Sequence, residues 1–220
     1  MRFGVLGTGM VGTTIGARLV GVGHEVRLGS RSPGGDRAVA WVAEAGEGAS
    51  EGSLADAAAF GDAVLNCTAG TGSIEALRAA GAENLAGKLL IDVANPLEHS
   101  GDSHPRLSVC NDDSLGERIQ REFPRARVVK ALNTMNCSVM VDPALVDGDH
   151  VAFLCGEDRS AKAAATGLLA EFGWPAERVI DLGGISAARA TEATIFLWVR
   201  IAQVVGSYRF NFEIARQASN

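Results

Sequence analysis

The sequence predicts an α/β protein built on a doubly wound parallel sheet, followed by a small C-terminal α/β extension. Residues 1–31 read as strand, glycine turn, helix and strand, which is the opening unit of such a sheet. Apolar strand-like runs then alternate with helix-like segments along the rest of the 220 residues, and this alternation favours parallel strands joined by right-handed crossovers. We expect a Rossmann-type domain over residues 1–145 and a smaller C-terminal portion over 146–220.

The glycines after the first strand indicate a dinucleotide site. The apolar run 3–6 leads into Gly7-x-Gly9-x-x-Gly12. In this motif the first glycine permits a tight turn, the second lets a pyrophosphate approach the backbone, and the third allows the helix to pack closely on the strand. The phosphates then lie on the amide groups at the helix start. The motif carries weight here because it lies between a predicted strand and a predicted helix.

The end of the second strand favours NADP(H) over NAD(H). A domain that selects NAD usually places Asp or Glu there, to bind the ribose hydroxyl. This chain has Ser30 and Arg31 instead, and a hydroxyl beside a guanidinium suits a phosphate dianion. Arg37 could add a second charge to the same phosphate. The alternative is that Arg31 is an ordinary solvated arginine in a loop.

The remaining elements follow from apolar periodicity and from helix-start residues. We expect helices over residues 10–22, 36–45, 70–80, 114–123, 160–172 and 186–206, and one that starts at Ser53-x-x-Asp56. Strands are expected over residues 25–29, 62–68, 88–93, 127–132, 151–155 and 179–182, with loops over 46–52 and 99–113. The helix over 186–206 is apolar on most sides, which predicts burial in the domain or in a subunit interface. Period-two alternation over 208–214 favours a terminal strand, with a frayed tail as the alternative.

Composition points to an ordinary globular protein of a reducing compartment. Hydrophobic residues make up 47% of the chain and the net charge is −6, which argues against nucleic acid or an anionic membrane as the main partner. No signal peptide and no membrane span are predicted, so we expect a cytoplasmic protein. The four cysteines are widely spaced, without the pattern of a metal site, and Cys67 and Cys155 lie in apolar runs as reduced core residues do.

Residues near the reactive end of the cofactor are predicted from the strand ends, because ligands of such sheets bind beyond the carboxyl ends of the strands. We expect Thr68 and Ala69 to flank the adenosine ribose and the pyrophosphate. Asn95-Pro96 and Asn133 should approach the nicotinamide. The alternatives are a turn residue before proline for Asn95 and a strand-end cap for Asn133.

These segments contain no convincing general acid. Reduction of a carbonyl requires a proton donor for the developing alkoxide. Lys130 and Asn133 have a Lys-x-x-Asn spacing used by hydroxyacid dehydrogenases, but those enzymes place the pair on a helix of a large all-α domain for which this chain has no room. The histidines at 24 and 150 are expected to be structural, and those at 99 and 104 lie in a polar loop. Hydride transfer to a flavin-type ring needs little acid–base help and depends on two rings held face to face.

The chain resembles the NADPH-dependent reductases of the deazaflavin coenzyme F420, the F420:NADP oxidoreductases. Four segments carry the resemblance, in the same order along nearly the whole chain: GTGMVGTTIGARLVGVGHEVRLGSR, VVKALNTM, LCGEDRSAKAAATGLLAEFG and DLGGISAARATEAT. The domain also resembles the cytosolic NADPH–flavin domain of membrane metalloreductases.

The resemblance implies a cofactor site and an acceptor site. Thr8, Gly9, Met10 and Val11 would bind the pyrophosphate, with Ser30 and Arg31 on the 2′-phosphate. The deazaflavin would stack on the nicotinamide between two turns, formed by Asn133, Thr134 and Met135 and by Gly184, Ile185 and Ser186. A homodimer through the apolar C-terminal helix is also implied. Family members that reduce F420 carry His in place of Asn133.

Three functions are therefore weighed. The first is an NADP(H)-dependent oxidoreductase that exchanges a hydride with F420, FMN or FAD as a small-molecule redox acceptor. The second is an NADPH-dependent reductase of a small carbonyl or imine, which the glycine motif supports equally but which lacks the usual helical domain. The third is a non-catalytic NADP(H)-binding sensor module.

Overall fold

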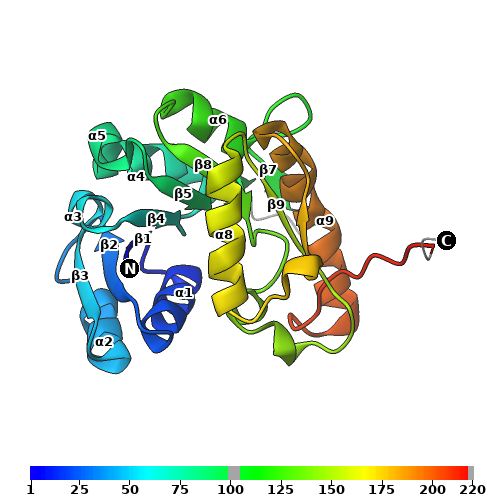
Figure 1. Ribbon diagram of the computed structural model, residues 1–220, viewed down its shortest axis with the longest axis horizontal. Helices are drawn as coiled ribbons and strands as arrows, with labels where there is room; N and C mark the ends of the chain where they lie inside the picture. The colour runs from blue at the N-terminus through cyan, green and yellow to red at the C-terminus, as the bar shows by residue number, and fades with distance from the viewer. Residues whose placement is uncertain (99–104, 218–220) are drawn as a thin grey trace.

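A computed structural model defines residues 1–98 and 105–217 of the chain and shows a central sheet flanked by helices (Figure 1). The strands of the sheet are β1 (Arg2–Leu6), β2 (Glu25–Ser30), β3 (Ala49–Ser53), β4 (Ala63–Asn66), β5 (Leu89–Asp92), β8 (Arg127–Ala131), β9 (Ala152–Cys155) and β10 (Val179–Asp181). The α-helices are α1 (Met10–Gly21), α2 (Asp36–Ala45), α3 (Leu54–Phe60), α4 (Ser73–Ala80), α5 (Ala82–Leu85), α6 (Leu115–Glu122), α7 (Cys137–Val141), α8 (Arg159–Glu171) and α9 (Ala188–Val205). Short 3-10 helices are η1 (Gly70–Gly72), η2 (Pro143–Leu145), η3 (Ala176–Arg178) and η4 (Ile185–Ala187), and β6 (Leu97–Glu98) pairs with β7 (Arg106–Leu107).

The strand order is β10-β9-β8-β5-β4-β1-β2-β3. The chain starts in the middle of the sheet, builds outward to β3, and then crosses back to lay β4 on the other side of β1. This is the doubly wound Rossmann-like α/β fold that the sequence predicts. The reversal of direction lies between β1 and β4, so the carboxyl ends of these strands define the place where a ligand is expected.

The central strands are buried on both faces, and their alternation divides the core into two layers. Val5 of β1, Leu65 of β4 and Ile91 of β5 belong to one apolar cluster, together with residues of α1, α2, α7 and α8. Leu6 follows Val5 and Val64 precedes Leu65, so their side chains point to the opposite face. Both belong to the second cluster, with residues of α3, α4 and α6. Each strand therefore holds helices on both sides of the sheet.

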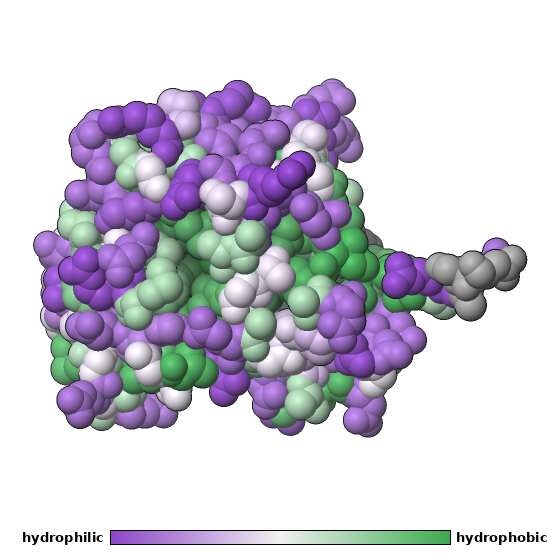
Figure 2. Space-filling model, viewed as in Figure 1, coloured by the Kyte–Doolittle hydropathy of each residue, from purple (hydrophilic) through white to green (hydrophobic). Residues whose placement is uncertain are grey.

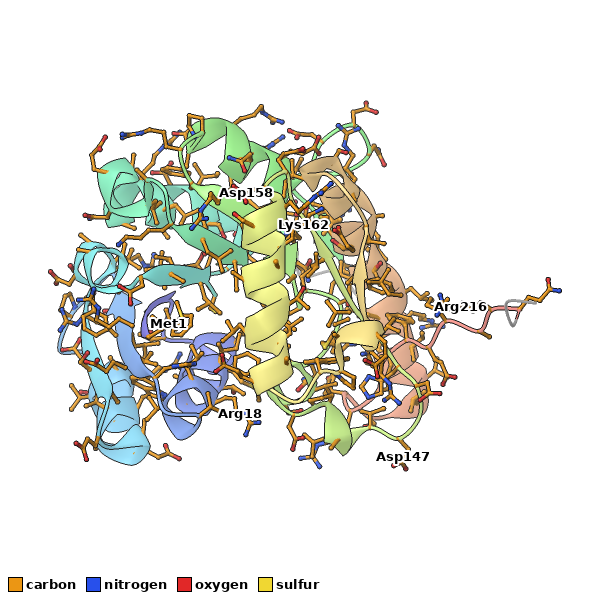
Figure 3. The ribbon with its side chains drawn as sticks, in the orientation of Figure 1. Met1, Arg18, Asp147, Asp158, Lys162 and Arg216 are labelled. Atoms are coloured by element: carbon orange, nitrogen blue, oxygen red, sulfur yellow. The ribbon has the colours of Figure 1, made fainter. Side chains whose placement is uncertain are left out.

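Helix α8 crosses the front of the sheet in the view of Figure 1, between α1 and α9. Asp158 begins it, since the carboxylate accepts the Ala161 N–H at 2.8 Å. Lys162 binds the Asp181 carboxylate at 2.8 Å and so ties the helix to β10 (Figure 3). At the other end, Arg18 of α1 donates to the carbonyl of Glu171 at 3.2 Å.

Most predicted elements are confirmed, but the loop prediction for residues 46–52 is wrong. Residues Ala49–Ser53 form the edge strand β3, which runs parallel to β2 with Val26 opposite Ala49. The segment ASEGS is polar and small because an edge strand half open to water needs no apolar pattern, so periodicity gives no signal there.

The sheet is mostly parallel, as predicted, with one antiparallel pair among its described strands. β9 runs antiparallel to β8, with Lys130 opposite Cys155, and β10 is parallel to β9. The connection from β8 to β9 contains only α7 and η2, and a five-residue helix is too short to carry the chain back across the sheet. The chain therefore enters β9 from the end at which β8 finished.

The predicted terminal strand over 208–214 does not form. Only one isolated bridge, between His150 and Glu213, is present in this segment. Its alternating apolar residues pack on α9 instead: the rings of Tyr208 and Phe210 stack on Trp198. The polar loop predicted over 99–113 falls partly outside the described residues, since 99–104 are not defined.

Helix α9 carries apolar side chains that are exposed in the single chain, so the domain itself does not bury them. Leu197 is 55% and Val204 73% exposed. In Figure 2 apolar surface lies beside the start of the C-terminal tail, with hydrophilic surface above and below it. None of the helices within residues 1–98 and 105–217 combines the length and the apolar character needed to span a membrane.

Candidate functional site

The start of α1 has the geometry of a phosphate-binding helix terminus. Gly9 is the N-cap and supplies no side-chain hydrogen bond, so the first amide groups of α1 have no side-chain partner. A Cβ atom built on Gly9 would meet no atom within 4 Å, whereas one on Gly12 would lie 2.1 Å from the Gly7 carbonyl oxygen. Gly9 thus faces open space above exposed amides, and Gly12 permits close packing between helix and strand. This arrangement fits a pyrophosphate at the helix start.

The end of β2 presents cations without protein partners. The side chains of Arg31 and Arg37 are exposed and make no hydrogen bond or ion pair with any residue in the described part of the chain. The Ser30 hydroxyl accepts the Ser32 N–H at 3.1 Å, which shapes the turn around Arg31. The guanidinium of Arg31, directly after β2, suits the proposed 2′-phosphate site, and Arg37 follows in the first turn of α2.

A cavity of about 270 Å³ opens beyond the carboxyl ends of β4, β5 and β8. It is lined by Val11, Cys67, Thr68, Ala69, Gly70, Thr71, Val93, Ala94, Asn95, Leu97, Asn133, Met135, Met140, Ile195 and Trp198. The structure thus brings together six of the residues selected from the sequence: Val11, Thr68, Ala69, Asn95, Asn133 and Met135. Pro96 and Thr134 are buried next to the cavity without lining it.

Two asparagines join the ends of β5 and β8 at the wall of this cavity. Asn133 Nδ2 donates to Asn95 Oδ1 at 2.9 Å, and Asn95 Nδ2 donates to the Asn133 carbonyl oxygen at 2.8 Å. Just before Asn133, Leu132 is buried with a φ of 65°, a left-handed conformation that bulky residues rarely adopt. The chain accepts this backbone strain where β8 ends, and the turn directs Asn133 toward Asn95.

Lys130 lies beneath the cavity in a buried ion cluster, which we define as Lys130, Asp92 and Glu192. Its Nζ is 2.8 Å from both Asp92 Oδ2 and Glu192 Oε1, and it also donates to the Ala94 carbonyl. Burial would lower the pKa of Lys130, but the attraction of the two carboxylates outweighs it, so the pKa lies above its ordinary value. With all three donors engaged and no place in the cavity lining, Lys130 is not positioned as a proton donor to a substrate.

Thr68 is held at the cavity wall by a polar network that continues from the ion cluster. Asn66 Nδ2 donates to Asp92 Oδ1 at 2.8 Å and to Ser73 Oγ at 3.0 Å. The Thr68 hydroxyl donates to Asn66 Oδ1 at 2.6 Å and lies 2.8 Å from Ser73 Oγ. The ends of β4 and β5 and the start of α4 are therefore fixed relative to one another.

The Gly184–Ser186 turn is not part of the cavity lining. The Ile185 N–H donates to Glu157 Oε1 at 3.0 Å, and the Ile185 side chain packs in the second apolar cluster against residues of α6. Within this chain the turn therefore lies beside β8 and β9 but does not line the cavity with Asn133.

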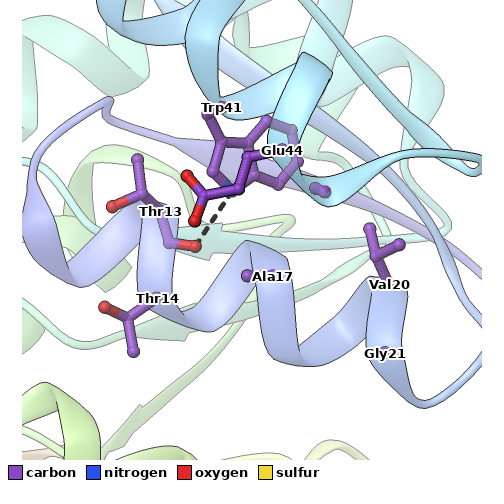
Figure 4. A pocket seen from close by; sticks show the side chains of 8 residues that line it. Thr13, Thr14, Ala17, Val20, Gly21, Trp41 and Glu44 are labelled. Atoms are coloured by element: carbon purple, nitrogen blue, oxygen red, sulfur yellow. Dashed lines mark hydrogen bonds between the residues drawn. The ribbon is translucent and has the colours of Figure 1, made fainter.

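A larger hollow of about 690 Å³ lies between α1 and α2 (Figure 4). Thr13, Trp41 and Glu44 are among its lining, but none of the predicted site residues is. The indole N–H of Trp41 already has a protein partner, since Trp41 Nε1 donates to the Thr13 carbonyl at 3.0 Å. We therefore place the candidate site at the smaller cavity, where strand ends, polar atoms and the start of α1 meet.

Sequence reasoning missed the wall of the cavity that α9 and α7 supply. Ile195 and Trp198 come from α9 and Met140 comes from α7. The apolar character of the 186–206 segment predicted a buried helix, but periodicity cannot tell which cavity a helix will border. A tryptophan within such a helix was the available signal.

The described cavity lining contains no Asp, Glu, His, Lys or Arg. Cys67 is a weaker acid than usual, because burial raises the pKa of its thiol. His24 binds Glu171 at 2.7 Å and His150 binds the Pro143 carbonyl at 3.0 Å, so both are structural, as predicted. His99 and His104 lie outside the described residues.

Comparison with known proteins assigns the chain to a family. The model of the family described as NADP oxidoreductase, coenzyme F420-dependent, matches residues 2–96. A crystal structure from Arthrobacter sp. FB24, provisionally named an F420-dependent NADP reductase, is 47% identical, has a TM-score of 0.92, and is aligned over 98% of this chain and 99% of that one. The chain belongs to the coenzyme F420-dependent NADP oxidoreductase family. The expectation drawn from the four sequence segments is thereby confirmed.

Two curated relatives match this family member over part of their length. Metalloreductase STEAP3 of Rattus norvegicus is 29% identical over 87% of this chain and 36% of its own length. The F420-dependent NADP reductase of Methanocaldococcus jannaschii is 29% identical over 50% of this chain and 49% of its own. The chain therefore spans about a third and about half of these relatives.

The fold extends to more distant reductases. An imine reductase of Streptomyces aurantiacus is 17% identical with a TM-score of 0.68, aligned over 93% of this chain and 64% of that one. At this identity the likeness concerns the fold alone.

Proposed function

We propose that this protein transfers a hydride between NADP(H) and a deazaflavin or flavin, with coenzyme F420 the first candidate acceptor and FMN and FAD the next. The observation that carries the proposal is a cavity beside the dinucleotide site whose described lining lacks an acidic or basic side chain. Carbonyl reduction needs a positioned proton donor, whereas ring-to-ring hydride transfer needs mainly orientation and exclusion of water. The family membership supports the same reading.

The cofactor side follows from the geometry of α1 and β2. NADP(H), when bound, supplies or receives the hydride. In this proposal the amides of Thr8, Gly9, Met10 and Val11 hold the pyrophosphate, and Ser30, Arg31 and Arg37 hold the 2′-phosphate. Thr68 and Ala69 flank the adenosine ribose and the pyrophosphate, and Asn95, followed by the buried Pro96, approaches the nicotinamide.

The acceptor side is proposed at the other end of the cavity. Asn133 and Met135 line it, and the α9 residues Ile195 and Trp198 supply a wall. The Gly184–Ser186 turn, which the family resemblance suggests as a second contact, packs against α6 instead. We therefore centre the acceptor site on Asn133–Met135 and α9.

The test is anaerobic oxidation of NADPH with F420, FMN or FAD, followed at the absorbance of each acceptor. We expect turnover with at least one of the three. Fast reduction of F420 would show that Asn133 replaces the family's histidine without loss of that activity, and reduction of flavin alone would assign the flavin as acceptor. Absence of turnover with all three would refute the proposal.

Reduction of an imine is the second candidate. An iminium carbon is already activated by its proton, so a cavity that lacks a general acid suits it better than it suits a ketone. Oxidation of NADPH by a panel of cyclic imines, in the absence of any flavin, would favour this candidate over the first.

We further propose a homodimer that buries the apolar face of α9. Phe196, Leu197, Val204 and Val205 are between 40% and 73% exposed in the single chain. Exposed large apolar side chains gathered on one helix often mark an interaction site. Light scattering after size-exclusion chromatography should give twice the chain mass, and Leu197→Asp with Val204→Asp should return the monomer; a monomeric wild-type protein would contradict this.

A further inference from the structure

Trp198 borders the cavity from α9 and is held in place by its neighbours. The rings of Tyr208 and Phe210 stack on its indole, with centroid separations of 5.8 and 5.4 Å and interplanar angles of 23° and 21°. Aromatic stacks of this kind restrict the orientation of the central ring. The edge of Trp198 is therefore a fixed feature of the cavity wall.

The indole N–H of Trp198 is buried without a hydrogen-bond partner. The other two tryptophans of the chain are satisfied: Trp41 Nε1 donates to the Thr13 carbonyl at 3.0 Å, and Trp174 Nε1 donates to the Met140 carbonyl at 2.9 Å. A buried indole usually finds a partner, so the free donor of Trp198 needs an explanation.

Asn133 supplies a free acceptor in the same cavity. Its Nδ2 donates to Asn95 Oδ1, which fixes the orientation of the amide and leaves Oδ1 outside this pair. That oxygen is buried and has no partner. Two residues that line the cavity therefore each carry a buried polar atom without a partner, a donor on Trp198 and an acceptor on Asn133.

We propose that Trp198 Nε1 and Asn133 Oδ1 together recognise an amide edge, a ligand N–H beside a ligand C=O. The ligand C=O accepts from Trp198, and the ligand N–H donates to Asn133. Two groups present this edge: the carboxamide of the nicotinamide ring and the pyrimidinedione edge of a flavin or deazaflavin. The inference rests on the proposed function, because it takes the cavity as the place where those rings meet.

The buried ion cluster fixes the two residues relative to each other. Glu192 precedes Trp198 on α9, and its carboxylate binds Lys130 and accepts the N–H groups of Leu115 and Gly116 at 2.8 and 3.0 Å. Lys130 in turn precedes Asn133 on β8. Because both anchors are buried, α9 and the end of β8 hold the pair in register.

Trp198→Phe tests the proposal, since it keeps an aromatic ring in the stack and removes only the N–H and the outer part of the indole. Trp41→Phe is the matched control, with the same chemical change in the groove between α1 and α2. Equilibrium titrations with NADPH, with 2′-phospho-ADP-ribose, which lacks the nicotinamide, and with F420 or FMN would be compared for the three proteins.

We expect Trp198→Phe to bind 2′-phospho-ADP-ribose as the wild type does, which shows that the fold and the phosphate site are intact. It should lose about tenfold in affinity for either NADPH or the acceptor, the scale of one neutral hydrogen bond. A loss confined to NADPH assigns the carboxamide, and a loss confined to the acceptor assigns the pyrimidinedione. Trp41→Phe should change neither affinity.

Equal binding of every ligand by Trp198→Phe and wild type would overturn the inference. An equal loss for 2′-phospho-ADP-ribose and NADPH would overturn it too, because the effect would then not depend on an amide edge. The proposed function fails separately: if NADPH binding depends on Trp198 but neither F420 nor flavin is reduced, the recognition pair stands and the acceptor assignment falls.

Discussion

Asn133 and Asn95 bind each other twice, side chain to side chain at 2.9 Å and side chain to backbone at 2.8 Å. These bonds join the ends of two neighbouring parallel strands at the wall of the cavity. Since Asn133 Nδ2 is used within the pair, the side chain presents only its oxygen to a ligand. Asn133 Oδ1 itself is buried and has no hydrogen-bond partner among the described residues.

The pair should be measurable as an energetic coupling. Asn95→Ala leaves Asn133 Nδ2 and the Asn133 carbonyl without these partners, and we expect the free energy of unfolding to fall by about 1–3 kcal/mol. Asn133→Ala should cost a similar amount. In urea denaturation the double variant should lose at least about 0.5 kcal/mol less than the sum of the single losses. Strict additivity would show that the two side chains do not depend on each other.

Arg31→Ala should weaken NADPH binding and leave NADH binding unchanged. A charge-assisted contact to a phosphate is worth about 1.5–3 kcal/mol, and the exposure of Arg31 places the expected loss at the lower end, near tenfold in Kd. Arg37→Ala is the comparison, with a smaller loss expected. Isothermal titration with both cofactors checks this, and equal weakening of NADH and NADPH would contradict the 2′-phosphate assignment.

Substitutions at Gly9 and Gly12 should have different effects, the first on NADPH binding and the second on stability. Gly9→Val places its side chain in open space above the α1 amides, so we expect NADPH binding to be lost while stability changes by no more than about 1 kcal/mol. Gly12→Ala drives a Cβ to 2.1 Å from the Gly7 carbonyl and should cost about 1–3 kcal/mol or more of stability. Thermal melts beside NADPH titrations measure both. Unfolding of Gly9→Val would mean that this glycine serves chain geometry rather than the ligand.

Glu117 should make the packing of α6 on α9 sensitive to acid. Its carboxylate binds Arg189 of α9 at 2.6 and 2.8 Å. The hydrogen bonds from Arg189, and then from Ser114, hold the pKa of Glu117 below its ordinary value despite burial. A carboxylate with a lowered folded-state pKa contributes stability above its unfolded pKa, and that contribution is lost as the pH falls through the folded pKa.

Glu117→Gln should therefore be less stable than the wild type at neutral pH, by about 1 kcal/mol because Arg189 is partly exposed. The difference should shrink as the pH is lowered from about 5 toward 2, since protonated Glu117 resembles Gln. Urea denaturation at several pH values checks this. A difference that is constant with pH would show that the loss comes from packing rather than from the charge.

Much of the fold was predictable from short segments. Val5, Leu65 and Ile91 lie in apolar runs that read as buried strands, and Gly7, Gly9 and Gly12 mark the first turn. The capping box at Ser53 and Asp56 was also recognised, with Asp in place of the usual Glu. The edge strand β3 was not predicted. Water can hydrogen-bond to its outer side, so its polar sequence shows no apolar pattern.

The site was predictable in part, for a reason of connectivity. Thr68, Asn95 and Asn133 each follow a strand, and parallel neighbours bring such residues to one edge of the sheet. Trp198 and Ile195 lie on a helix that follows the last strand, and no rule of strand order places that helix over a cavity. Lys130 showed a catalytic spacing, but the structure surrounds its amine with Asp92 and Glu192.

The sequence by itself determined the doubly wound sheet, the dinucleotide turn and the cationic end of β2, because each depends on residues close together in the chain. Only the tertiary structure decided the reversed direction of β9, the buried partners of Lys130 and the unpaired polar atoms of Trp198 and Asn133. Those features depend on contacts between distant segments, where burial removes the water that would otherwise satisfy every polar group. The local sequence pattern does not show which hydrogen-bond partners a polar atom has after water is excluded.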